Sequence, residues 1–263
     1  MEHTFRRKAN TGTRYDLGGA IAIVTGGGRG LGKAIALGLA RAGSGVVVVS
    51  RTETEIESVA QEIRGAGGRA LAVVTDLTSA EQIEDLVEAT IAEFARVDIL
   101  VNNAATSYMA PLLDFKESSW DSTFDTNCKG PFLLSRAVAR RMIDQGGGKI
   151  INITTVGAER GGVGMGVYHA SKGALKMLTM CMAAEWAPHN INVNAVGPGL
   201  TRTEFSRPIW DHRARVEKYL SAVPKARVAE PEEIVGAVVF LASDASDFIT
   251  GQSIYVDGGY LAT

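Results

Sequence analysis

The 263-residue sequence predicts an α/β fold, a single doubly wound parallel sheet with helices on both faces. Short runs rich in β-branched residues alternate along the chain with longer segments of helical period. These runs are apolar almost throughout, which is typical of strands buried on both faces, as in parallel sheets covered by helices. The expected strands are Ala20–Thr25, Val46–Ser50, Ala70–Thr75, Asp98–Asn102, Lys149–Thr154, Asn192–Val196 and Ser253–Val256.

Several of the helices between these strands carry start signals. Thr52 followed by Glu55 has the spacing of a capping box, in which each side chain bonds the other residue's backbone amide. Thr78 followed by Glu81 has the same spacing ahead of the third helix. Pro231 stands where a proline is tolerated in the first turn of a helix. These signals support the alternation of strands and helices.

The chain is expected to form one domain. Residues 1–17 are polar and lack the apolar stretch of a signal peptide, so they predict a flexible N-terminal tail, and residues 18–263 a single catalytic domain. Residues 199–224 do not follow the alternation. They are long for a plain connection and predict a lid over a substrate.

Composition argues against several functional classes. The 27 basic residues nearly balance the 29 acidic ones, with no long run of like charge, so neither nucleic acid nor a membrane is an expected partner. Cys128 and Cys181 form no CxxC pair, and no histidines stand at metal-ligand spacing, so no metal is expected. No apolar run approaches the roughly 18 residues of a membrane span. A cytoplasmic location is the expectation.

A glycine-rich turn joins the first expected strand to the first helix. Its glycines, Gly26, Gly28, Gly30 and Gly32, permit a tight turn and let the backbone approach a pyrophosphate. The helix that follows supplies free N–H groups and a partial positive charge at its N-terminus. A glycine-rich turn in this position predicts a dinucleotide site and thus a Rossmann-type sheet.

The residues at the end of the second strand indicate which dinucleotide binds. A site for NAD normally has Asp or Glu there, which accepts hydrogen bonds from the ribose 2′-hydroxyl. This chain has Ser50 and Arg51, and an arginine pairs with a 2′-phosphate that a carboxylate would repel. Arg29, in the glycine turn, is a second candidate. Two solvated surface arginines are the alternative, which the missing acid disfavours, so NADP(H) is the expected cofactor.

Tyr168 and Lys172 stand four residues apart in a helical segment that runs to about Ala187. Residues at this spacing share one helix face, with a rise of about 6 Å. A tyrosine has an ordinary pKa of about 10, and a neighbouring lysine cation lowers it toward the working range of an acid/base. Such a pair is also common on exposed helix faces, so its weight comes from the other motifs.

Taken together, these motifs resemble those of the short-chain dehydrogenase/reductase family, from Gly18 to Gly259. The matching segments are Thr25–Gly32, Asp76, Asn102–Ala105, Asn127, Tyr168 with Lys172, Pro198-Gly199 with Thr203, Thr250-Gly251 and Val256–Gly259. The resemblance implies an NADP-dependent oxidoreductase that moves a hydride between the cofactor and a small-molecule carbonyl/secondary alcohol pair. Because the family is usually tetrameric, it also implies a homotetramer.

The resemblance also implies catalytic roles for four residues. Tyr168 would protonate the carbonyl oxygen during reduction, and Lys172 would lower its pKa and hold the nicotinamide ribose. Asn127 would seat a water in the proton relay. Thr155 occupies the position of the family's usual catalytic serine, thirteen residues before the tyrosine, and supplies the same hydroxyl.

The implied cofactor contacts come from several segments. They are Gly26, Gly28, Arg29, Gly30, Leu31, Gly32, Ser50, Arg51, Asp76, Leu77, Asn103, Ala104, Ala105, Tyr168, Lys172, Pro198, Gly199, Thr201 and Thr203. Asp76 would bond the adenine and Thr203 the nicotinamide amide, while Asn102 and the backbone after it would line the cofactor. Ala105 replaces a commoner glycine, and we expect its methyl group to be tolerated.

The substrate is left open at this level. Residues 198–210 and 102–105 are similar to those of NADPH-dependent carbonyl reductases and, less closely, tropinone reductases. Bacterial 3-oxoacyl-carrier-protein reductases and gluconate 5-dehydrogenases share most of the motifs and remain alternatives. A non-catalytic cofactor-binding regulator is disfavoured by the intact Asn127, Tyr168 and Lys172. A non-redox use of the cofactor, such as epimerisation, is not excluded.

Overall fold

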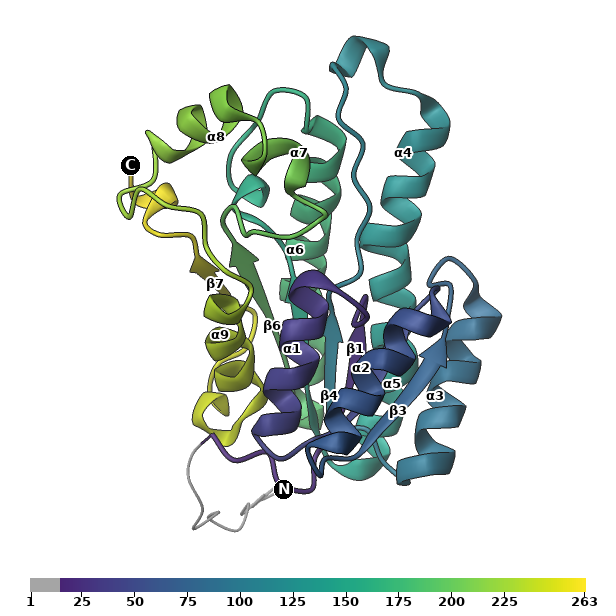
Figure 1. Ribbon diagram of the computed structural model, residues 1–263. Helices are drawn as coiled ribbons and strands as arrows, with labels where there is room; N and C mark the ends of the chain where they lie inside the picture. The colour runs from purple at the N-terminus through teal and green to yellow at the C-terminus, as the bar shows by residue number, and fades with distance from the viewer. Residues whose placement is uncertain (1–14) are drawn as a thin grey trace.

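A computed structural model describes residues 15–263 and contains a seven-stranded sheet whose neighbouring strands are all parallel (Figure 1). The strand order is β3-β2-β1-β4-β5-β6-β7. The strands are β1 (Ile21–Thr25), β2 (Gly45–Ser50), β3 (Ala70–Val74), β4 (Ile99–Asn102), β5 (Gly148–Ile153), β6 (Ile191–Pro198) and β7 (Ser253–Val256). Every strand expected from the sequence is present, with ends shifted by no more than two residues, and the predicted fold class is confirmed.

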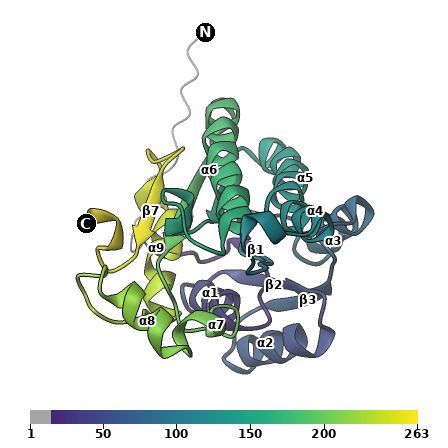
Figure 2. The ribbon, with the colours of Figure 1, turned by 90° about the horizontal axis from the view of Figure 1, so that it is seen from above.

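Helices cover both faces of the sheet, and Figure 2 shows α1 and α2 on one side with α5 and α6 on the other. One layer contains α1 (Gly30–Arg41), α2 (Glu53–Gly65) and α9 (Glu232–Ala242), and the other contains α3 (Ala80–Phe94), α5 (Gly130–Gln145) and α6 (Gly166–Trp186). Ala22 and Val24 of β1 pack into the first layer, while Ile21 and Ile23 pack into the second. Successive strand residues face opposite sides, so a continuous apolar run fills both layers.

The helix starts differ in detail from the capping boxes that the sequence suggested. Thr52 is the N-cap of α2, but its side chain makes no capping hydrogen bond. The N-cap of α3 is Ser79, not Thr78, and its hydroxyl accepts from the N–H of Gln82 at 3.3 Å. The prediction was wrong by one residue because the Thr78 hydroxyl donates to Asp76 at 2.8 Å instead. Pro231 is the N-cap of α9 and lies just before its first turn.

The expected lid, residues 199–224, folds into two short helices, α7 (Arg207–Trp210) and α8 (Arg213–Leu220). Figure 1 shows them beyond the carboxyl end of β6. Each of the two helices is held by a hydrogen bond to the part of the segment just after β6. The indole N–H of Trp210 donates to the carbonyl of Thr203 at 2.9 Å, and the N–H of Leu200 donates to the Tyr219 hydroxyl at 2.9 Å. Its movement on substrate binding stays a prediction.

The N-terminal boundary lies slightly earlier than expected. Residues 1–14 of the expected tail lie outside the described residues. Leu17 is only 4% exposed, and its N–H donates to the carbonyl of Ala42 at 2.7 Å, so the packed domain already includes Leu17. Within residues 15–263, no helix is long and apolar enough to cross a membrane, and no cluster of His, Cys, Asp and Glu could hold a metal ion.

Candidate active site

A cavity of about 690 Å³ lies at the carboxyl end of the sheet. It is lined by the turns that follow β1, β2, β3, β4 and β5, by the start of α6 and by the segment after β6. The chain leaves β1 toward β2 on one side, while β4 lies on the other, so the strand order reverses beside the glycine turn. In open parallel sheets, ligands bind at this reversal point.

The glycine turn is shaped to admit a phosphate group. Gly26 and Gly30 have φ angles of +63° and +51°, which side chains other than glycine rarely adopt. A Cβ atom at Gly32 would lie 2.0 Å from the carbonyl oxygen of Gly26, so only glycine fits there. Arg29, the N-cap of α1, makes no side-chain capping bond, and the first N–H groups of α1 are left to an outside acceptor. These features fit a pyrophosphate.

The segment after β4 is fastened to this turn through Thr25 and Asn103. The Thr25 hydroxyl accepts from the N–H groups of Asn103 and Ala104 at 2.9 and 3.1 Å. The Asn103 side-chain amide donates back to the carbonyls of Thr25 and Gly26 at 2.9 and 3.3 Å. These four hydrogen bonds therefore fix the loop after β4 relative to the glycine turn after β1.

Asn102, which the resemblance placed beside the cofactor, points into the core. Its side chain is 1% exposed and donates to the Ser135 hydroxyl at 2.9 Å and to Asn152 at 2.8 Å. This corrects the expectation for Asn102. In this segment, the residues that line the cavity begin at Asn103, just after the end of β4.

The residues predicted to bind the 2′-phosphate of NADP lie at the end of the cavity beside β2. Ser50, Arg51 and Arg29 all line it. Arg29 lies 3.6 Å from Glu55 in a largely exposed ion pair, which solvent screens. Asp76 lines the cavity as well, and its pKa lies below the ordinary value, mainly because the N–H of Thr78 bonds the carboxylate and, less strongly, because Arg51 is close.

At the other end, Tyr168 and Lys172 project from the first turns of α6. Lys172 is 1% exposed, and its ammonium donates to the carbonyl of Ile153, the last residue of β5, at 2.7 Å. Burial lowers the pKa of Lys172 to about 8. Burial raises the pKa of Tyr168 above its ordinary value.

The net lowering of the Tyr168 pKa that the spacing to Lys172 predicted is therefore wrong, because burial raises this pKa. Helical spacing does place both residues at one cavity, but the ammonium is directed to a backbone carbonyl of β5. Loss of solvent disfavours the charged form of each group, and at Tyr168 this effect is the dominant one.

Two neighbouring threonines at the end of β5 have different surroundings. The Thr154 hydroxyl donates to the carbonyl of Val196 at 3.2 Å, on β6. The Thr155 side chain lines the cavity, and its oxygen accepts from the N–H of Gly157 at 3.3 Å. Because that bond uses the oxygen as acceptor, the hydroxyl hydrogen of Thr155 stays available for a ligand.

Asn127 lies in a π-helical turn, Asp125–Lys129, and is fully buried. Its side-chain oxygen accepts from the N–H of Thr106 at 2.8 Å, while its amide donates to the carbonyl of Thr106 at 2.9 Å and to the Ser171 hydroxyl at 3.0 Å. Like Asn102, and unlike the other predicted catalytic and cofactor-binding residues, Asn127 does not line the cavity. Its side chain joins the loop after β4 to α6, and its predicted part in a water relay stays a prediction.

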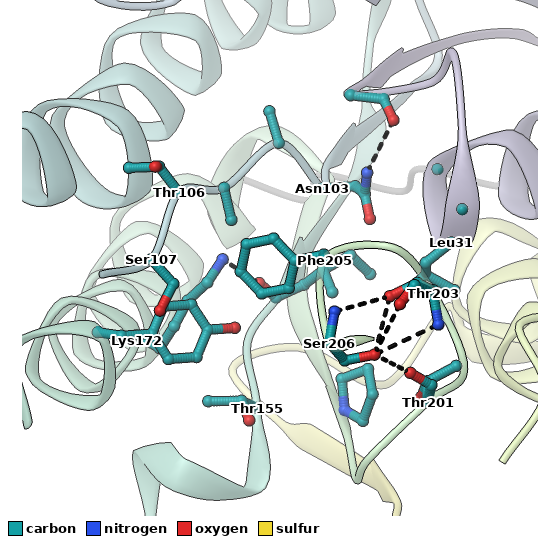
Figure 3. Close-up of a pocket in the computed structure, with 18 of the residues that line it drawn as sticks. Leu31, Asn103, Thr106, Ser107, Thr155, Lys172, Thr201, Thr203, Phe205 and Ser206 are labelled. Carbon is teal, nitrogen blue, oxygen red and sulfur yellow. Dashed lines mark hydrogen bonds between the residues drawn. The ribbon is translucent and has the colours of Figure 1, made fainter. Parts of the chain in front are cut away.

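Sequence reasoning missed the apolar side chains of the cavity. The ring of Phe205 lies 5.8 Å from that of Tyr168, and Figure 3 shows Phe205 in the middle of the view, between Lys172 and Thr203. Met109, Met165, Pro208 and Ile209 line the same cavity. Their only signal in the sequence was the position of three of these five residues inside the expected lid.

Comparison with known proteins adds independent evidence. Residues 26–261 match the family model described as Enoyl-(Acyl carrier protein) reductase. The chain is 40% identical over 209 residues to 2-dehydro-3-deoxy-D-gluconate 5-dehydrogenase of Dickeya dadantii, which covers 79% of this chain and 83% of that protein. It is 39% identical over 245 residues to gluconate 5-dehydrogenase of Gluconobacter oxydans, which covers 93% and 96%.

The fold is also found among solved structures. A gluconate 5-dehydrogenase from Burkholderia cenocepacia, solved in complex with NADP and tartrate, superposes with a TM-score of 0.92. It is 39% identical, and the match covers 95% of this chain and 98% of that one.

Proposed function

The chain belongs to the short-chain dehydrogenase/reductase family and is an oxidoreductase, and from this premise we propose that it transfers a hydride between NADP(H) and a carbonyl/secondary alcohol pair. The observation that carries the proposal is that Tyr168, Lys172 and Thr155 line the same cavity as the glycine turn. One end of this cavity fits a pyrophosphate, and the other holds a proton donor.

The chain's own residues account for cofactor binding. The first turn of α1 would hold the pyrophosphate, Asp76 the adenine, and Arg51 with Arg29 the 2′-phosphate. The related Burkholderia cenocepacia enzyme was solved with NADP, which supports this choice of cofactor. When bound, the reduced cofactor supplies the hydride.

The raised pKa of Tyr168 suits it to be the acid in the reducing direction. A buried neutral phenol keeps its proton at neutral pH and donates it to the carbonyl oxygen as negative charge develops there. The Thr155 hydroxyl would donate a hydrogen bond to the same oxygen, a contribution that typically lowers a barrier by about 3–4 kcal/mol. Lys172, mostly protonated below its pKa of about 8, favours the phenolate that remains.

Asn127 contributes by position. It joins Thr106 of the cavity wall to Ser171, and the Ser171 hydroxyl in turn donates to the carbonyl of Tyr168 at 2.8 Å. Through this chain of bonds it would fix the loop after β4 against the turn of α6 that carries the phenol. A part for Asn127 in seating a relay water remains the prediction of the family resemblance.

A sugar-acid dehydrogenase is the second candidate, because relatives at 39–40% identity carry gluconate-type names. The carbonyl-reductase subtype rests only on the similarity of residues 198–210 and 102–105. The homotetramer likewise rests on the usual oligomeric state of the family, and light scattering on the purified protein tests it.

The direct test is absorbance of NADPH in the presence of a panel of carbonyl compounds. Net oxidation of NADPH by any of them, at a rate proportional to protein concentration, supports the proposal. A protein that binds NADPH and oxidises none of it in any panel would instead be a cofactor-binding regulator. Isomerised product without net oxidation would indicate an epimerase.

A further inference from the structure

The end of the cavity that faces the substrate is walled by apolar side chains. Met109 follows β4, Val156 and Met165 belong to the segment between β5 and α6, and Phe205 and Ile209 belong to the lid. Three segments far apart in the sequence therefore contribute the same chemistry. All of them lie beyond the residues that fit the cofactor.

Two of these side chains expose much of their surface although both line the cavity. Met109 is 43% exposed and Phe205 is 49% exposed. A single exposed apolar residue is ordinary, but several around one concave site indicate a surface that a ligand covers. Phe205 contacts Tyr168, with the rings 5.8 Å apart, so the apolar surface begins beside the reacting atoms.

The apolar surface continues outward along two loops that are joined to each other. The N–H of Ala110 donates to the carbonyl of Gly164 at 3.1 Å, and Leu112 packs against Gly166. On the outer part of these loops, Leu113 is 99% exposed and Val163 is 97% exposed. A substituent that leaves the cavity between the loops would meet the hydrocarbon of Leu113 and Val163 on their outer part.

Several polar side chains at this end already bond to the protein itself, whereas the Nδ1 atom of His169 is buried without a partner among residues 15–263. Lys172 is directed to the carbonyl of Ile153. Glu204 also lines the cavity, in an exposed ion pair with Arg207. Ser107 lies 3.9 Å from the sulfur of Met165. An open-chain sugar acid presents a carboxylate and several hydroxyls, and those that meet the apolar side chains would lose water without an equivalent partner.

Arg160 is the residue of the cavity wall that favours an anionic substrate. Its guanidinium lies 4.8 Å from the centre of the Tyr260 ring, and it donates to the Tyr260 carbonyl at 3.3 Å. These contacts hold it against the C-terminal segment at the cavity wall. A single guanidinium among apolar side chains would bind an anion only weakly, and the variant Arg160→Gln tests its contribution.

We propose that the substrate is a ketone or secondary alcohol whose substituent is a hydrocarbon chain or ring, rather than a polyhydroxylated acid. The proposal rests on the function proposed above and names the class of compound that the same site takes. The carbonyl would lie between Tyr168 and Thr155, with the substituent against Met109 and Phe205.

The test compares kcat/KM for NADPH-dependent reduction of 2-butanone, 2-hexanone and 2-octanone with that for 5-keto-D-gluconate. Burial of one methylene is worth about 0.8 kcal/mol, which corresponds to a factor of about four. We expect kcat/KM to rise about two- to fourfold per methylene and 2-octanone to exceed 5-keto-D-gluconate by more than tenfold.

A pair of matched variants shows where the substituent binds. Met109→Gln replaces the wall residue by a polar one of similar length and is expected to flatten the dependence on chain length. Met177→Gln makes the same change at a 58% exposed methionine of α6 that does not line the cavity, and should preserve the dependence. A general loss of folded protein lowers all rates together and leaves the dependence unchanged.

The outcomes separate the two proposals. A flat series, or a preference for 5-keto-D-gluconate that Arg160→Gln abolishes, overturns the apolar substrate but keeps the hydride transfer. An equal chain-length dependence in Met109→Gln and Met177→Gln overturns the assigned wall. If the protein binds NADPH and oxidises it with neither class of compound, the proposed function fails, and the substrate class fails with it.

Discussion

The ammonium of Lys172 donates a 2.7 Å hydrogen bond to the carbonyl oxygen of Ile153, which joins α6 to the end of the interior strand β5. This bond holds a buried cation in the wall of the cavity that Tyr168 also lines. It also satisfies the carbonyl group at the end of β5.

Replacement of Tyr168 by Phe tests the proton donor. The ring and its contact with Phe205 are kept, and only the acid is lost. Positioned acid–base groups contribute about 10²–10⁴-fold, so kcat should fall by that factor while the NADPH dissociation constant changes less than about threefold. Steady-state kinetics and fluorescence titration measure the two quantities. Undiminished turnover in Tyr168→Phe would mean that another group donates the proton.

The buried cation predicts a pH-dependent cost of folding. The pKa of Lys172 falls from 10.5 to about 8, so the folded state binds its proton less tightly than the unfolded chain does. The cost is complete below pH 8, shrinks as the pH rises toward 10.5, and reaches up to about 3 kcal/mol at one pKa unit per 1.4 kcal/mol.

Lys172→Met should therefore be more stable than the parent near pH 7, less the value of the lost bond to Ile153, and its advantage should shrink by pH 10. Urea unfolding of the two proteins at both pH values measures the difference. A difference in unfolding free energy that is the same at pH 7 and pH 10 would contradict a lowered pKa. Activity should be lost in either case.

Thr155 is expected to stabilise the developing negative charge. Thr155→Val keeps the side-chain shape and removes the donor, and should lower kcat by about 10²–10³-fold with little change in NADPH affinity. Thr155→Ser should retain most of the activity. Thr154→Val is the matched control, because the Thr154 hydroxyl is bonded to Val196 instead. If Val were harmless at 155 and damaging at 154, the donor would be assigned to the wrong threonine.

The preference for NADPH over NADH should depend on Arg51. Arg51→Gln removes a cation from the predicted 2′-phosphate site and should weaken NADPH binding by tens-fold at low salt, with NADH binding nearly unchanged. Arg41→Gln, in the last turn of α1, does not line the cavity and serves as control. Equal affinities of the parent protein for the two cofactors would rule out the assignment.

The lid prediction concerns residues 199–224. Proteolysis in this segment should slow when NADPH and a ketone are present together, since a closed lid exposes less backbone. Mass spectrometry of the fragments locates the cleavage sites. Equal cleavage rates with and without ligands would argue against closure.

The strands and the phosphate-binding turn were predictable because their signals are local. β1 is an unbroken apolar run, and its burial on both faces follows from the alternation of strand residues. Gly26, Gly30 and Gly32 are required by their own backbone angles and close contacts. The family motifs added the positions of Tyr168 and Lys172.

Predictions failed where two local choices compete or where distant groups decide the energy. Thr78 and Ser79 are both good capping residues, and the nearby Asp76 takes the hydroxyl of the first. The pKa of Tyr168 depends on how much water the surrounding segments exclude, which the spacing to Lys172 does not reveal.

By itself, then, the sequence determined the parallel sheet, the cofactor end of the cavity and the helix that carries the phenol. Only the tertiary structure decided what surrounds the substrate. Met109, Met165 and Phe205 come from three irregular segments whose paths depend on long-range contacts such as the bond from Ala110 to Gly164. Hydrophobic periodicity predicts which residues share a face of one helix or strand. The wall of this cavity combines residues from separate loops, so its chemistry becomes clear only in the folded protein.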